Sequence, residues 1–173
     1  MQFILALIFI FNPFKPVFSA AVSPSCMCNR TSDSLALVDV YNNANGASWI
    51  SPWNLSMPMT TWLGVSLDAN QCVRALILDN RGLSGTLSSQ IGMLSNLRTL
   101  SLLNNNLTGN IPSSIGDLSQ LEDIILSDNN FTGEIPDFFA SLPALKIISM
   151  SNNFFIGNIP KSIGSIFGLL TLD

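Results

Sequence analysis

Few side chains of this sequence could carry out a reaction. Four of its carboxylates are candidates for acid and base catalysis: Asp79, Glu122, Asp123 and Asp128. A pair of carboxylates can hydrolyse a glycosidic bond, provided that a pocket desolvates one of them. The sequence contains no histidine, which excludes histidine general bases, histidine-containing triads and histidine-ligated metals. A carboxylate-based glycoside hydrolase is therefore the enzyme class that these residues leave open.

Three cysteines offer a second kind of chemistry. Cys26 and Cys28 are one residue apart, which is too close for an easy mutual disulfide, because a bridge prefers a Cα separation of about 5.5 Å. We expect Cys72 to pair with one of them and to leave a spare thiol, as suits an oxidising compartment. Three thiols without a histidine do not favour zinc. We therefore expect no metal and no cofactor.

Composition limits the partners of this chain. Its 173 residues are enough for one domain. Only 10% of them are charged, with a net charge of -4, whereas about 25% is usual for soluble globular chains. Because nucleic-acid binding calls for clustered Lys and Arg, a nucleic-acid partner is not expected.

The first residues have the pattern of an export signal. Residues 3–11 form an apolar run that is too short to cross a bilayer, which needs about 20 residues. Small residues at 19–21 offer a cleavage site, so we expect residues 1–21 to be a signal peptide and the mature chain to be secreted. A short membrane anchor is the alternative. Four N-x-[ST] sequons are candidate glycosylation sites in that compartment: Asn29, Asn54, Asn106 and Asn130.

A repeat with a period of 24 residues dominates the second half of the chain. Units start at Leu97, Leu121 and Leu145, preceded by a less regular unit from Val73 and followed by a truncated one from Leu169. The pattern L-x-x-L-x-L-x-x-N-x-L at this period is the leucine-rich repeat signature. Its L-x-L pairs predict short parallel strands that bury these side chains: Leu100/Leu102, Ile124/Leu126 and Ile148/Met150.

Other positions of the repeat have expected structural roles. Asn105, Asn129 and Asn153 come where the chain turns out of the strand, and their amides can satisfy backbone groups of their own and neighbouring turns. A glycine follows where the backbone must bend, and an Ile-Pro pair then leads into a short helical turn. The convex side of the core is expected to contain Ile115/Leu118, Phe139/Leu142 and Ile163/Ile166.

With its L-S/T-G-x-I-P-x-x-I/L-G-x-L element, the chain resembles the plant-type leucine-rich repeat of receptor-kinase ectodomains, receptor-like proteins and polygalacturonase inhibitors. The resemblance covers residues 73–173, which hold four repeats and a truncated fifth. It implies an α/β solenoid, a right-handed leucine-rich repeat superhelix with a concave parallel β-sheet and a helical N-terminal cap.

Residues 22–72 look like the N-terminal cap of such proteins. Within them we expect a helix capped by Ser32 or Asp33 and ended by Asn45-Gly46, then a hairpin formed by residues 61–67 and 72–78. Trp49, Trp53 and Trp62 are expected to seal the end of the core, with sugar stacking as the alternative. The cap departs from the plant pattern because Leu67 stands where a cysteine is usual. The amino-acid pattern of the cap also resembles that of secreted leucine-rich repeat proteins of bacteria and protists.

The exposed strand positions of a solenoid form its variable surface. Here they make a mildly acidic face with an apolar stripe through Ile77, Leu103, Ile125 and Ile147. Exposed apolar patches mark interaction sites, although isoleucine also simply favours strands. The expected partner-binding residues are Ile77, Asp79, Thr99, Ser101, Leu103, Asp123, Ile125, Ser127, Ile147 and Ser149.

The sequence therefore predicts a secreted module that recognises an extracellular protein or peptide and has no catalysis of its own, because an open sheet desolvates no carboxylate. The resemblance implies a receptor-ectodomain-like or inhibitor-like role. The alternative is a structural protein that binds a polysaccharide or ice. The concave face measures only about 300 Å², against about 800 Å² per partner in a standard interface. We also expect that the chain is a fragment of a longer protein, or that it self-associates through an uncapped edge at Leu169 and Leu172.

Overall fold

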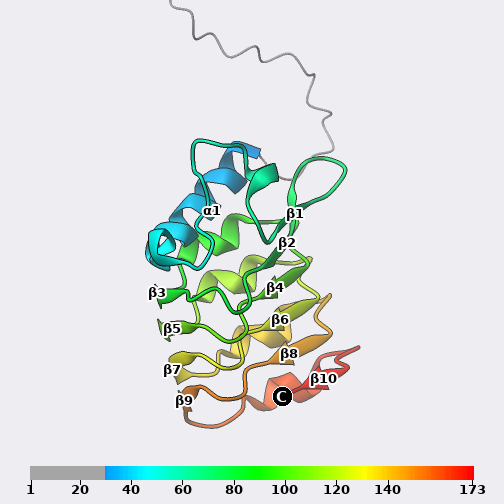
Figure 1. Ribbon diagram of the computed structural model, residues 1–173. Coiled ribbons are helices and arrows are strands. Elements are labelled where there is room, and N and C mark those ends of the chain that lie inside the picture. The colour runs from blue at the N-terminus through cyan, green and yellow to red at the C-terminus, as the bar shows by residue number, and fades with distance from the viewer. Residues whose placement is uncertain (1–29) are drawn as a thin grey trace, which may run out of the picture.

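The computed structural model describes residues 30–173, so the expected signal peptide, Cys26, Cys28 and Asn29 lie outside the described part. The chain coils into a stack with a helical cap at its N-terminal end (Figure 1). Two sheets follow the stack, a six-stranded one of order β1-β2-β4-β6-β8-β10 and a four-stranded one of order β3-β5-β7-β9. Among residues 30–173, no helix is long and apolar enough to cross a membrane.

The six-stranded sheet contains the strands that the repeat predicted. It consists of β1 (Val65–Leu67), β2 (Val73–Ile77), β4 (Thr99–Ser101), β6 (Asp123–Ile125), β8 (Ile147–Ser149) and β10 (Thr171–Leu172). β1 is antiparallel to β2, as expected for a hairpin, and the other pairs are parallel. The side chains expected inside are buried, with relative exposures between 0% and 5%. The leucine-rich repeat solenoid with its N-terminal helical cap is confirmed.

The second sheet was not foreseen from the sequence. It consists of β3 (Ser84–Thr86), β5 (Asn106–Gly109), β7 (Asn130–Glu134) and β9 (Phe154–Ile156). A glycine of each coil lies in or just after one of these strands with a positive φ, such as 78° at Gly109 and 81° at Gly133, a conformation that a residue without a Cβ adopts readily. The backbone bends at these glycines, as the sequence predicts, and they also take part in or adjoin the hydrogen-bonded pairing of the second sheet.

Short 3-10 helices line the side opposite the first sheet. They are η3 (Ser89–Met93), η4 (Ser113–Asp117), η5 (Asp137–Ser141) and η6 (Lys161–Ser165). Proline precedes the last three of them, as the Ile-Pro pairs predicted, because its fixed φ suits the start of a helical turn. The core positions expected on this side are buried, except that Ile166 is half-buried.

Buried asparagines connect successive coils. The Oδ1 atom of Asn105 accepts hydrogen bonds from the backbone N–H groups of Arg81 and Leu83, at 3.1 and 3.0 Å. Its Nδ2 donates to three carbonyl groups, those of Leu78, Leu102 and Leu103. Asn129 repeats the arrangement one coil further on, and Asn153 follows it. Their expected structural role is confirmed.

The cap helix begins earlier than the sequence predicted. α1 spans Arg30–Asn43, and Asn45 follows it in the left-handed conformation with φ 57°. Asp33 is therefore not the capping residue but lies inside the first turn, where its Oδ2 accepts a hydrogen bond from the N–H of Val73 at 2.9 Å. Burial raises the pKa of this carboxyl group, and its Oδ1 has no hydrogen-bond partner among the described residues.

Aromatic rings close the N-terminal end of the core. Trp49, Trp53 and Trp62 are at most 5% exposed. The ring of Trp53 stacks on that of Trp62 at 5.0 Å and on that of Tyr41 at 5.7 Å, and each indole N–H donates to a backbone carbonyl. Rings buried in this way cannot stack on a sugar, so the sealing role is the correct one. Trp49 directly follows η1 (Gly46–Ser48), and Trp62 directly follows η2 (Met59–Thr61).

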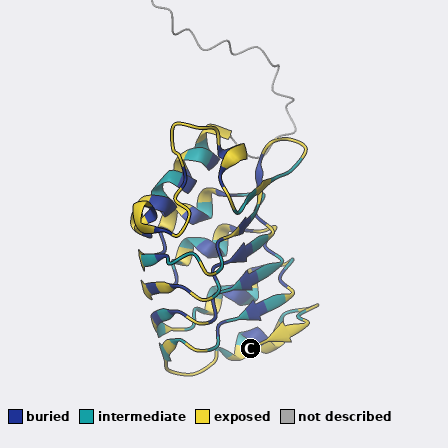
Figure 2. Cartoon of the chain, viewed as in Figure 1, coloured by how far each residue is buried: buried dark blue, intermediate teal, exposed yellow. Residues whose placement is uncertain are grey.

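The chain is largely exposed at the other end of the stack (Figure 2), and several of its exposed residues are apolar. Phe167 is 99% exposed, Leu170 77% and Leu172 47%, whereas Leu169 packs partly against the core. Self-association through this end stays a prediction.

Asn129→Leu is expected to destabilise the fold strongly. The leucine has a similar volume but leaves the N–H of Leu107 and three carbonyl groups without their buried partner, which costs about 3 kcal/mol of unfolding free energy. Urea denaturation measures the difference. The matched control is Asn158→Ala at an exposed asparagine, expected to change stability by less than about 0.5 kcal/mol. Equal effects would contradict the role of the ladder.

Cys72 is expected to be linked to Cys26 or Cys28. In the structure it is fully buried and disulfide-bonded, and its partner stays a prediction because both candidates lie outside the described residues. Peptide mapping of the non-reduced protein by mass spectrometry identifies the link, and Cys72→Ser is expected to cost about 2–4 kcal/mol of unfolding free energy. Three free thiols, or a bridge between Cys26 and Cys28, would refute the pairing.

Candidate functional site: the concave sheet

The outward side chains of the first sheet form two columns. Its register places Thr99, Asp123 and Ile147 opposite one another, and likewise Ser101, Ile125 and Ser149. Ile77 precedes Ser101 in the second column. We call this surface, together with Asp79, Leu103 and Ser127 just beyond the strands, the concave face. The ten residues predicted to bind a partner therefore belong to one side of the sheet, although not all of them are exposed.

The apolar stripe is only partly covered. Ile77 is 44% exposed, and Leu103, Ile125 and Ile147 are half-buried. Ile77, Ile125 and Ile147 lie on β2, β6 and β8, and Leu103 lies just beyond the end of β4. Apolar side chains left in this state at the centre of a sheet can lose water when a partner covers them.

Two of the predicted positions are not available to a partner. Ser101 and Ser127 are each 4% exposed, so the expectation that they are exposed is wrong. Ser101 donates to Oδ1 of Asp79 at 2.6 Å, and the hydroxyl groups of Ser127 and Ser149 lie 2.7 Å apart. A small hydroxyl side chain between two coils is covered by these neighbours, which period-two alternation alone does not reveal.

The four candidate catalytic carboxylates bind to neighbouring coils. A general acid of a glycosidase needs a raised pKa, whereas Glu122 has a lowered one. Within residues 30–173, no cluster of three or more metal-ligating side chains is placed to hold a metal ion. The hydrogen-bond donors are Ser101 and the Leu103 N–H for Asp79, Thr99 for Asp123, Asn152 for Asp128, and Arg98 and Lys146 for Glu122.

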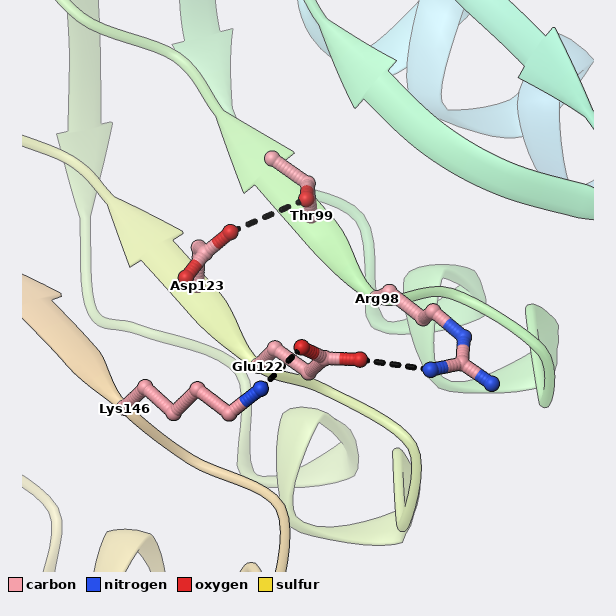
Figure 3. Close-up of polar contacts among 5 residues, drawn as sticks. All are labelled: Arg98, Thr99, Glu122, Asp123 and Lys146. Carbon is pink, nitrogen blue, oxygen red and sulfur yellow. Dashed lines mark hydrogen bonds and ion pairs between the residues drawn. The ribbon is translucent and has the colours of Figure 1, made fainter. Parts of the chain in front are cut away.

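A charged row borders the concave face where the strands begin (Figure 3). Glu122 lies between Arg98 and Lys146, with O···N distances of 2.6 and 2.5 Å. Hydrogen bonds from Lys146 and then from Arg98 hold the pKa of Glu122 below its usual value. The sequence pattern presents Glu122 only as a catalytic candidate. Comparing the residue before each strand across the repeats would have revealed the row.

The described sequons lie away from the concave face. Asn54 belongs to the cap and is exposed, and Asn106 and Asn130 lie on β5 and β7 of the second sheet. Asn106 is exposed, whereas Asn130 is half-buried. Glycosylation at these sites stays a prediction.

Glu122→Gln is expected to lower stability in a pH-dependent way. Because the pKa of Glu122 is lowered in the folded state, its ionised form stabilises the fold above pH 4.5, its value outside the fold. That contribution disappears as the pH falls through the lowered pKa. Thermal melts of both proteins across this range test the prediction. The control is Glu134→Gln, an exposed carboxylate in no ion pair within the described chain. A pH-independent difference for Glu122→Gln would contradict the assignment.

Comparison with known proteins agrees with this architecture. The family model of the leucine-rich repeat matches residues 96–118, 120–142 and 144–166. No curated protein matches the chain. The ectodomain of the receptor kinase SOBIR1 from Arabidopsis thaliana is 30% identical, with a TM-score of 0.62, over 82% of this chain and 90% of that one.

A second solved structure holds a larger relative in complex. The Arabidopsis receptor kinase HAESA, with the peptide hormone IDA and the co-receptor SERK1, is 30% identical with a TM-score of 0.65. The match covers 81% of this chain and 24% of that chain, and in PEPR1 the chain spans 20% of the length.

A plant ice-binding protein shares the fold. It is 24% identical, with a TM-score of 0.58, over 82% of this chain and 54% of that one, and at this identity the likeness concerns the fold alone. Together, the matched repeats, the capped solenoid and the identity to a receptor-kinase ectodomain over nearly its whole length show that the chain belongs to the plant leucine-rich repeat proteins that resemble the ectodomains of receptor kinases.

Proposed function

We propose that this chain is an extracellular recognition module that binds a protein or peptide through its concave face and catalyses no reaction. The observation that carries the proposal is the half-covered apolar stripe of Ile77, Leu103, Ile125 and Ile147. Partly exposed apolar side chains gathered on one face of a sheet mark interaction sites, and a rigid stack of strands presents them at little cost in ordering.

The molecules in the solved structures of similar proteins support this proposal. The structure of HAESA contains a peptide hormone and a co-receptor, and the matched part of SOBIR1 is the ectodomain of a receptor kinase. A disulfide-bonded Cys72, the expected signal peptide and the sequons favour the same extracellular setting. A receptor-ectodomain-like role and an inhibitor-like role both fit this description.

The proposal of a non-catalytic role follows from the state of the carboxylates. The side chains of Asp79 and Asp123 already accept hydrogen bonds from residues of neighbouring coils, and they lie on a sheet face rather than in an enclosed site. Glu122 is held ionised by two cations. None of the three therefore has the environment of a carboxylic acid that donates a proton.

Ile125→Arg is expected to abolish partner capture. A charge at the centre of the stripe would have to be desolvated by the partner, and losses are largest near the centre of an interface, about 2 kcal/mol or more. The measurement compares tagged wild type and variant as baits for extracellular fluid, with captured proteins identified by mass spectrometry and re-bound in purified form. Leu103→Asp serves as an independent second variant.

The matched control is Ile156→Arg, the same substitution at an exposed isoleucine of the second sheet. It should keep the captured partners. Loss of capture by Ile156→Arg and retention by Ile125→Arg would reject the concave face. That result would favour binding through the outer polar residues, as the polysaccharide or ice alternative requires.

A further inference from the structure

A polar groove adjoins the concave face where β2, β4 and β6 begin. It encloses about 690 Å³. Asp68 contributes from the loop between β1 and β2, Arg74 and Arg98 from the strand starts, and Asn96 and Gln120 from the turns that precede β4 and β6. The groove lies next to the charged row, since it shares Arg98 with it.

The cations of this groove exceed the carboxylates that could neutralise them. Arg98 shares the single carboxylate of Glu122 with Lys146. Arg74 is in no ion pair within the described part of the chain, although its charge acts on Asp68. Three cations therefore face two carboxylates, Asp68 and Glu122. The whole chain nevertheless has a net charge of -4. The strand-start edge is thus a local exception to the overall charge.

Asp68 does not cancel this excess by direct contact, because its own loop occupies its carboxylate. One oxygen accepts the N–H groups of Asn70 and Cys72 at 2.8 and 3.0 Å, and the other accepts the amide of Asn96 at 3.0 Å. Partial desolvation acts to raise the pKa of Asp68, but these hydrogen bonds and the nearby positive charge of Arg74 outweigh it and hold the pKa below its usual value.

The cations form a row across the sheet. Arg74, Arg98 and Lys146 stand one residue before the aligned positions Ala75, Thr99 and Ile147, near the start of their strands. Glu122 occupies the equivalent position before Asp123, so this row holds three cations and one carboxylate. An extended ligand that crosses the strand starts would therefore encounter an excess of positive charge in this row.

We propose that the groove binds carboxylate groups of an acidic peptide segment, and that this segment orients the partner whose remainder covers the apolar stripe. The proposal rests on the proposed function and names the chemistry of its ligand. Guanidinium groups bind carboxylates with paired hydrogen bonds, and the neighbouring amides of Asn96 and Gln120 can add neutral donors. The groove also enlarges a concave face of only about 300 Å², which alone is small for an interface.

The test uses the mature secreted chain and a fluorescent poly-aspartate peptide with an amidated C-terminus, followed by anisotropy at low salt. The same peptide with Asn at every Asp is the neutral control. A third peptide, the Asn version with a free C-terminal carboxylate, distinguishes a terminal carboxylate from acidic side chains. Binding of either carboxylate-bearing peptide but not of the neutral one is the expected result.

Arg74→Gln is expected to weaken this binding by about tenfold, the effect of removing a charged hydrogen-bonding partner. The matched control is Lys161→Gln, which removes one exposed charge on η6 and should change affinity by less than about twofold. Equal weakening by both variants would overturn the proposal, because it would show attraction to net charge alone. Arg74-dependent binding of oligogalacturonate that displaces the peptide would also overturn it, in favour of an anionic polysaccharide.

The two proposals can fail separately. Partner capture that is lost in Ile125→Arg, together with peptide binding that ignores Arg74→Gln, overturns the groove alone. Arg74-dependent peptide binding, together with capture that survives Ile125→Arg, supports the groove and overturns the concave face. Circular dichroism of each variant confirms that it is folded before either result is interpreted.

Discussion

The three regular coils of this solenoid depend on an asparagine that follows their first strand and is buried or half-buried. The chain turns inward there, and backbone groups that no sheet ladder reaches would be buried without partners, at a cost of about 1–3 kcal/mol for each group. The amide of Asn105 contacts five such groups over two coils. Because four of these five bonds recur at Asn129 and at Asn153, they keep successive coils at one spacing and in one register.

That register makes a surface out of short strands. Strands such as β4 and β6 have only three residues, and isolated strands of this length are not stable. Stacked at about 4.8 Å, they place equivalent residues of different repeats in columns. The columns create the apolar stripe and the charged row, and both properties belong to the stack rather than to any single repeat.

The two ends of the described stack differ in how far their apolar side chains are covered. At the N-terminal end, Trp53 lies between the rings of Tyr41 and Trp62, and Asp33 ties the cap helix to the start of β2. The buried carboxylate has one oxygen without a hydrogen-bond partner among the described residues. Burying that oxygen is unfavourable for folding, whereas the other oxygen joins the helix to the sheet. At the other end, Phe167 and Leu170 stay open to solvent.

The sequence by itself determined the coil: the 24-residue period, the buried L-x-L pairs, the asparagine ladder and the sealing tryptophans all follow from local pattern. Only the tertiary structure decided what lies between coils. It buries Ser101 and Ser127 against adjacent strands, forms the second sheet at the glycine bends, and moves Asp33 from a cap to a bond with Val73. It also places Arg98 and Lys146 on either side of Glu122. The physical reason is that a period specifies which residues are equivalent, whereas contacts between equivalent residues depend on how the coils stack.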